Sequence, residues 1–118
     1  MKLSEFMELE QKQKNKYHNR KVVLPNGETY ASEKEYKRGC ELQPMERAGL
    51  ISDLKKQVRF ELIPKQSGER ACYYVADFVY NDKKGKHVVE DAKGKRTKEY
   101  VIKRKLMLEV HGIKIVEV

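Results

Sequence analysis

The sequence predicts an α/β (α+β) fold in which a mixed central β-sheet is flanked by helices. Three observations lead to this prediction. Three strand-like runs follow one another between residues 58 and 94. A helix with a clear start signal precedes them, and a second helix and a last strand follow. The order αβββαβ describes a three-strand meander whose last strand is joined through a helical crossover to a fourth.

The segment before the sheet carries a short predicted helix, a hairpin and a longer helix. Residues 3–13 have an apolar side and are expected to be helical, and a basic, loop-like stretch follows them. Asn26-Gly27 is a strong turn signal between two short β-rich runs, so a hairpin is predicted there. Ser32 and Glu35 have the spacing of a capping box, which predicts a helix from about residue 33 to residue 48.

Two residues define the end of this longer helix. Gly49 suits the left-handed position that follows many helices. Pro44 lies inside the predicted span and removes one backbone donor, so a kink or break near Gln43 is expected.

The strand-like runs are rich in β-branched and aromatic residues, as paired strands are. They read VRFELI (58–63), YYVADFVY (73–80) and VVEDAKG (88–94), with turns expected at 65–70 and 81–86. Residues 98–110 are expected to form the second helix, which ends before Gly112, and residues 113–118 the last strand.

Composition narrows the class of protein. A chain of 118 residues with 39% hydrophobic content is expected to form one compact domain over residues 1–118, with residues 1–20 as an N-terminal helix and basic arm. A net charge of +8, from 26 Lys and Arg against 18 Asp and Glu, favours a polyanionic partner, although it is also compatible with a merely well-dispersed soluble protein.

Several other classes find no support in the sequence. No apolar run approaches the ~20 residues that span a bilayer, and the N-terminus lacks a signal-peptide pattern. Cys40 and Cys72 lie far apart in the sequence and are expected to be reduced thiols, which suits the cytoplasm. They share no zinc-ligand spacing with the three histidines. We therefore expect a cytoplasmic location, without membrane contact or structural zinc.

Charged residues interrupt two of the apolar strands. Asp77 lies in the middle of one, and Asp91 and Lys93 lie in the next. Side chains alternate along a strand, so Asp91 and Lys93 are expected on one face and Glu90 and Ala92 on the other. Carboxylates that converge in an apolar sheet must be neutralised or hold a metal. This pattern favours metal-dependent hydrolysis of a phosphodiester; the alternative is an edge carboxylate beside an ordinary ion pair.

These same residues carry a resemblance to a known superfamily. The runs YVADFVY and VVEDAKG, the basic helix KEYVIKRKLM and the closing strand GIKIVEV resemble the PD-(D/E)XK, or restriction-endonuclease-like, nucleases. More narrowly, KYHNRKV, the SEKE helix start and AGLISDLKKQVRFELIP resemble a family of short phage and prophage proteins of unknown function, suspected to be endonucleases. The resemblance covers about residues 16–118.

The resemblance implies a role for four residues. Asp77 matches the first metal-binding aspartate, Asp91 the second acid of the motif, and Lys93 its lysine. Glu35 matches the acid that many members add from the first helix. The sequence departs from the pattern at Ala76, where a proline that is not a ligand often stands.

Two positions in this assignment have alternatives. Pro44 interrupts the helix that carries Glu35, so a rotated helix would present Glu33 instead. Gln57, just ahead of the first predicted strand, is either a polar helper in the site or a turn residue.

The expected cofactor is Mg²⁺, with Mn²⁺ as a substitute. Mg²⁺ prefers one or two carboxylates plus water and phosphate oxygens. Asp77, Asp91 and the backbone carbonyl of Ala92 would supply part of this shell, and Glu35 would bind the same ion or help hold a second one. Lys93 is expected to position the attacking water and stabilise charge, in preference to abstracting a proton.

Basic residues near the motif are the candidates for contact with DNA, although a solvated helix face is the common alternative. They comprise the loop and helix residues Lys95, Arg96, Thr97, Lys98, Lys103 and Arg104, and a second arm of Lys16, His18, Arg20 and Lys21.

The sequence therefore predicts a Mg²⁺-dependent DNA endonuclease, phage-encoded and acting in DNA recombination or processing, with branched DNA such as a Holliday junction among its candidate substrates. The alternative is a non-catalytic nucleic-acid-binding accessory protein of a phage. A protein–protein adaptor is a third hypothesis, which the charge balance does not support. Resolution of a branched junction would require a homodimer, for which the sequence offers no clear seam.

Overall fold

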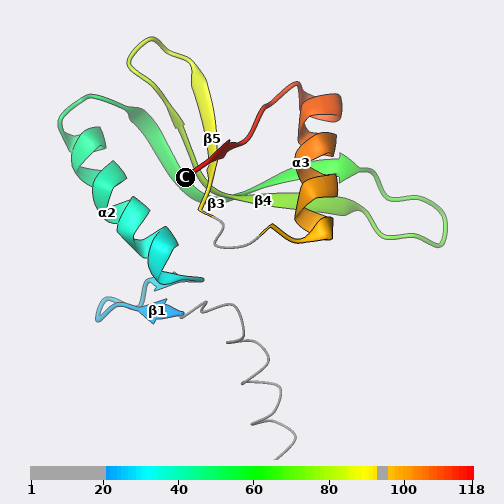
Figure 1. The fold of residues 1–118 in the computed structure, drawn as a ribbon, viewed down its shortest axis with the longest axis horizontal. Helices are drawn as coiled ribbons and strands as arrows, with labels where there is room; N and C mark the ends of the chain where they lie inside the picture. The colour runs from blue at the N-terminus through cyan, green and yellow to red at the C-terminus, as the bar shows by residue number, and fades with distance from the viewer. Residues whose placement is uncertain (1–20, 93–95) are drawn as a thin grey trace, which may run out of the picture.

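The computed structural model describes residues 21–92 and 96–118 and contains two helices and six strands in these ranges (Figure 1). In chain order these are β1 (Val22–Val23), β2 (Thr29–Tyr30), α2 (Glu33–Arg47), β3 (Ser52–Ile63), β4 (Cys72–Asn81), β5 (His87–Asp91), α3 (Lys98–His111) and β6 (Val116–Glu117). The helix predicted for residues 3–13 lies outside the described residues.

The main sheet has four strands in the order β3-β4-β5-β6. β3, β4 and β5 are antiparallel neighbours, whereas β6 returns through α3 to lie parallel to β5. The sheet is therefore mixed, and the order from α2 to β6 is αβββαβ, which confirms the predicted fold class. β1 and β2 form a separate two-stranded sheet, the predicted hairpin.

Helix α2 begins and ends at the predicted signals. The Ser32 side chain accepts a hydrogen bond from the backbone N–H of Glu35, and Gly49 has a φ of 77° after the last turn. The expected break near Gln43 is wrong, because α2 continues through Pro44 to Arg47. Pro44 is exposed and lies in the penultimate turn, where only one intrahelical bond is lost.

Two strands differ in length from the prediction. β3 begins at Ser52, six residues before the predicted start, because its polar first half SDLKKQ lacks the apolar alternation that marks a strand. Gln57 therefore lies inside β3 and not ahead of it. The last strand is shorter than predicted and spans only Val116–Glu117.

The helices pack on the sheet through two separate apolar clusters. The α2 cluster contains Tyr30, Leu42, Ile51, Phe78 and Tyr80, and the α3 cluster contains Leu62, Tyr74, Ala76, Val79, Val89, Tyr100, Met107 and Ile115. Gly39 of α2 allows close approach, because a Cβ there would lie 3.2 Å from the Tyr30 ring. Neither described helix is long and apolar enough to cross a membrane.

The regular alternation of side chains breaks where β3 and β4 meet at Gln57 and Asp77. Ala76 and Val79 both belong to the α3 cluster, although residues three apart on a regular strand face opposite ways. The register pairs Lys56 with Phe78 and Val58 with Ala76. Gln57 of β3 therefore lies opposite Asp77 of β4. Gln57 has a φ of 54°, which is unusual for a residue with a side chain. An acid and an amide thus lie together at an irregular point of the sheet.

Candidate functional site

Gln57 connects an acid on helix α2 to an acid on strand β4. Its side-chain amide nitrogen lies 2.7 Å from Oε1 of Glu35 and 3.4 Å from Oδ1 of Asp77. The first contact is a good hydrogen bond and the second is a long one. The irregular backbone of Gln57 thus directs one donor toward two carboxylates that are 42 residues apart in the sequence. Strained backbone of this kind is often found at functional sites.

Glu35 is buried, with 1% of its surface exposed, whereas Glu33 is exposed. Its Oε2 accepts a hydrogen bond of 3.1 Å from the backbone N–H of Ala31. Burial raises the pKa of the Glu35 carboxyl, and the negative charge of Asp77 raises it further; hydrogen bonds from Ala31 and Gln57 only partly oppose this. Of the two glutamates weighed from the sequence, it is therefore Glu35 that faces Asp77.

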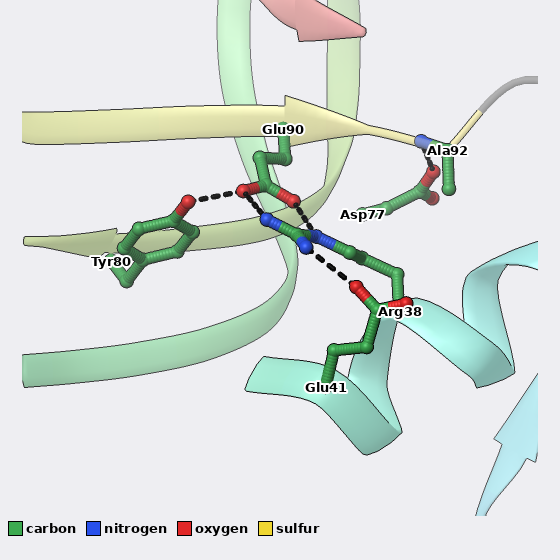
Figure 2. Close-up of polar contacts among 6 residues, drawn as sticks. All are labelled: Arg38, Glu41, Asp77, Tyr80, Glu90 and Ala92. Atoms are coloured by element: carbon green, nitrogen blue, oxygen red, sulfur yellow. Dashed lines mark hydrogen bonds and ion pairs between the residues drawn. The ribbon is translucent and has the colours of Figure 1, made fainter. Parts of the chain in front are cut away.

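Asp77 is held against the end of β5. Its Oδ2 accepts a hydrogen bond of 2.8 Å from the backbone N–H of Ala92, the residue after β5 (Figure 2). Asp77 is half-buried, so its carboxylate is accessible from solvent. This bond fixes the backbone immediately after Asp91, where the motif residues follow.

Asp91 is buried on the side of the sheet that faces α3. Its Oδ2 accepts a hydrogen bond from the hydroxyl of Tyr74. Burial is the first cause that raises the pKa of the Tyr74 hydroxyl. The hydrogen bond to Asp91 and the negative charges of Asp91 and Asp77 raise it further. Both aspartates therefore act on one hydroxyl and share a neighbourhood. Within residues 21–92 and 96–118, however, no three metal-ligating side chains converge on one point.

Next to Asp91, Glu90 lies on the opposite face in a network that sequence reasoning missed (Figure 2). Arg38 of α2 binds both oxygens of Glu90, through Nε and Nη2, each at 2.8 Å, and the Tyr80 hydroxyl donates to Oε2. The Glu90 side chain is 1% exposed. Burial, together with this bond, raises the pKa of Tyr80 to about 12. A further bond of 2.7 Å joins Arg38 to the exposed Glu41.

A signal for this network was present in the sequence. Alternation along β5 assigns Glu90 to the face opposite Asp91, where a buried carboxylate needs a cation. Arg38 lies one turn after Glu35, so it projects from the same side of α2. The Arg38–Glu90 pair thus joins the helix that carries Glu35 to the strand that carries Asp91.

Most of the described basic residues predicted to contact DNA lie around α3, whereas Lys21 is exposed just before β1. Arg96 and Arg104 both bind Glu117 of β6, at 2.6 and 2.8 Å. Lys103 lies 3.2 Å from Glu99, and Lys98 is exposed at the first residue of α3. Thr97 caps α3 by accepting a hydrogen bond from the N–H of Tyr100, so its observed role is structural. The other residues predicted to contact DNA, Lys16, His18, Arg20 and Lys95, lie outside the described residues, as does the motif lysine Lys93.

The structure therefore brings together Glu35, Gln57 and Asp77 and ties Asp77 to the Ala92 backbone, whereas the Asp91 side chain is buried on the α3 side against Tyr74. A family model described as "Protein of unknown function (DUF1064)" matches residues 14–115, so the chain belongs to this family. No curated protein and no solved structure matches the chain.

Replacement of Arg38 should destabilise the fold. Arg38→Met leaves the buried Glu90 carboxylate without its cation, and we expect the free energy of unfolding to fall by about 3–5 kcal/mol in urea denaturation. Arg38→Met combined with Glu90→Gln should regain most of the loss, because the buried charge is then absent as well.

Glu41→Gln is the matched control, because it removes the exposed partner of the same guanidinium. It should change the free energy of unfolding by no more than about 0.5 kcal/mol. An Arg38→Met protein as stable as Glu41→Gln would contradict the proposed importance of the buried pair.

Removal of the Asp77 charge should lower the pKa of Glu35. In metal-free buffer the Glu35 carboxyl should titrate above the ordinary range of glutamate, and Asp77→Asn should bring its pKa closer to that range, with burial still holding it above. A raised native pKa means that the stabilising contribution of Glu35 is present below its unfolded pKa and is lost as the pH rises through the folded one. Asp77→Asn should narrow this window.

Carboxyl NMR titration measures the pKa of Glu35 in the wild type and in Asp77→Asn. Asp53→Asn is the control, because Asp53 is exposed and its φ of 55° is tolerated by asparagine. The explanation fails if the Glu35 pKa is ordinary in the wild type, or if Asp77→Asn and Asp53→Asn affect it equally.

Proposed function

We propose that this protein is a Mg²⁺-dependent DNA endonuclease, and that Glu35, Asp77 and Asp91 hold the metal ion. The observation that carries the proposal is the chain of contacts from Glu35 through Gln57 to Asp77 and on to the Ala92 backbone. It links the helix acid, the first aspartate and the segment of the second acid, which are the positions that the resemblance to PD-(D/E)XK nucleases assigns to the site.

The chemistry of the donor set fits a hard divalent cation. All the side-chain groups are carboxylates, and Mg²⁺ is usually bound by one or two of these with water completing the shell. Burial and the Asp77 charge together raise the pKa of Glu35, so the protein does not fully neutralise this acidic pair by itself. The Tyr74 hydroxyl orients the Asp91 carboxylate, as groups behind metal ligands commonly do.

Each residue of the candidate site has a proposed part in the reaction. Asp77 and Asp91, with the carbonyl of Ala92, would hold the ion, and Glu35 would contact it directly or through water. When bound, Mg²⁺ would polarise the phosphate and lower the pKa of water. The Gln57 amide would keep Glu35 and Asp77 in position. Lys93 is assigned by sequence alone to orienting the attacking water and offsetting charge on the phosphate.

The basic residues support a proposal for the substrate class. A net charge of +8 and the exposed cations around α3 favour a nucleic acid backbone. We infer that the substrate is DNA, met during phage recombination or processing in the host cytoplasm, with a four-way junction as one candidate. Cutting both strands of a junction would require a second copy of the chain.

Binding of nucleic acid without cleavage is the second candidate. The observation that favours it is that the described residues bring no three metal-ligating side chains together. A binding module, however, gains nothing from carboxylates directed at phosphates.

Cleavage assays separate the two functions. Linear duplex, single-stranded and four-way-branched DNA are incubated with the protein in Mg²⁺, Mn²⁺ or chelator. We expect cutting only with metal, and Asp77→Ala, Asp91→Asn and Lys93→Ala should each reduce the rate by about 100-fold or more while DNA binding persists. Asp53→Asn should cut like the wild type. Wild-type binding without cutting would favour the binding role, whereas variants that cut as fast as the wild type would contradict the proposed catalytic site.

A further inference from the structure

Two arginines from different elements converge on one carboxylate at the surface. Nε of Arg96, before α3, lies 2.6 Å from Oε2 of Glu117, and Nη1 of Arg104, on α3, lies 2.8 Å from Oε1. Each carboxylate oxygen is thus bound by a separate guanidinium. The side chains of Arg96, Arg104 and Glu117 are 64%, 32% and 24% exposed, so a ligand in solution can reach the cluster.

The strand that carries Glu117 lies directly beside the candidate site. Glu117 pairs with Asp91 in the parallel register of β5 and β6, and the N–H of Val118 donates to the carbonyl of Asp91 at 3.1 Å. Both Asp91 and Glu117 act on the Tyr100 hydroxyl, whose pKa is raised first by burial and then by the charges of these two acids. An anion held by Arg96 and Arg104 would therefore adjoin Asp91.

In this cluster two guanidiniums bind an anion that belongs to the protein itself, the Glu117 carboxylate. Guanidiniums bind phosphate oxygens with the same planar forks that they offer to carboxylates. Ion pairs that water can reach contribute little to stability, so exchange of one anion for another has a small cost. The bonds from Arg104 and Arg96 lower the pKa of Glu117, which keeps it charged and bound to them at neutral pH.

We propose that Arg96 and Arg104 form a binding seat for a backbone phosphate of DNA, and that Glu117 occupies this seat until the phosphate displaces it. Glu117 therefore limits the affinity for DNA, which restricts tight binding to substrates that can deliver a phosphate beside Asp91. This inference rests on DNA as the proposed partner, but not on cleavage. A purely structural Glu117, which only ties β6 to α3, would not limit DNA affinity.

Glu117→Gln tests the proposal through DNA binding in chelator, where no cutting occurs. Fluorescence anisotropy with a labelled duplex, over a series of KCl concentrations, should give about tenfold higher affinity and a log–log salt slope steeper by about 1. Glu109→Gln is the matched control, since Glu109 is an exposed glutamate of α3 and its loss changes the net charge equally. It should raise affinity by no more than about threefold.

A second background makes the test independent of net charge. In an Arg96→Gln/Arg104→Gln protein, Glu117→Gln should bring no more gain than Glu109→Gln, because the seat is gone. Glu117→Asp, which keeps the carboxylate, should bind DNA like the wild type. Thermal unfolding followed by circular dichroism verifies that each variant is folded. If Glu117→Gln does not fold, Glu117→Ser takes its place in the same comparison.

Three results would overturn the proposal. Equal gains from Glu117→Gln and Glu109→Gln would show that only net charge matters. A Glu117→Gln gain that persists without the two arginines would place the effect elsewhere. In both cases the wild type still binds DNA, so the proposed function survives. A wild type that binds no DNA would remove the proposed function together with this inference.

Discussion

The buried ion pair between Arg38 and Glu90 is the contact on which the candidate site depends. Glu35 lies on α2 and Asp91 on β5, and these elements are far apart in the chain. Arg38 follows Glu35 by three residues, and Glu90 precedes Asp91 by one. The pair therefore joins α2 to β5 close to both Glu35 and Asp91 in the sequence (Figure 2). Buried charges need excellent geometry, and the two-point contact with the additional Tyr80 bond provides it.

The irregular point at Gln57 and Asp77 is the second constraint, and it has a chemical use. A regular sheet would leave Asp77 among apolar neighbours of one face. The interruption instead gives the Asp77 carboxylate access to the Ala92 N–H and to the Gln57 amide, which also binds Glu35. A left-handed backbone at a residue with a side chain costs about 1–2 kcal/mol, so its presence beside two acids favours a functional reason. The proposed metal ion would offset the charge gathered there.

Much of the fold was predictable from local signals. Asn26-Gly27, the Ser32 cap and the apolar strands predicted the elements, and the αβββαβ order follows from them. The first half of β3 was missed, because polar residues paired only on one edge carry no apolar period. The continuity of α2 through Pro44 was also missed, since a single lost bond near a helix end is tolerated. Asp77 and Glu35 were found as candidates, but their link through Gln57 depends on a backbone irregularity that sequence patterns do not encode. The contacts of Glu117 with Arg96 and Arg104 are tertiary contacts, and sequence patterns likewise did not predict them.

The central claim is that the acids around Gln57 and Asp77 bind one divalent ion, and paramagnetic NMR tests it most directly. Mn²⁺ added in small, substoichiometric steps broadens backbone amides close to where it binds. We expect the amides of Gln57, Asp77 and Ala92 to broaden first, with competition by excess Mg²⁺, and those of the exposed acids Asp53 and Asp82 to be unaffected. Broadening spread evenly over the acidic surface, or confined to residues away from Asp77, would contradict the account.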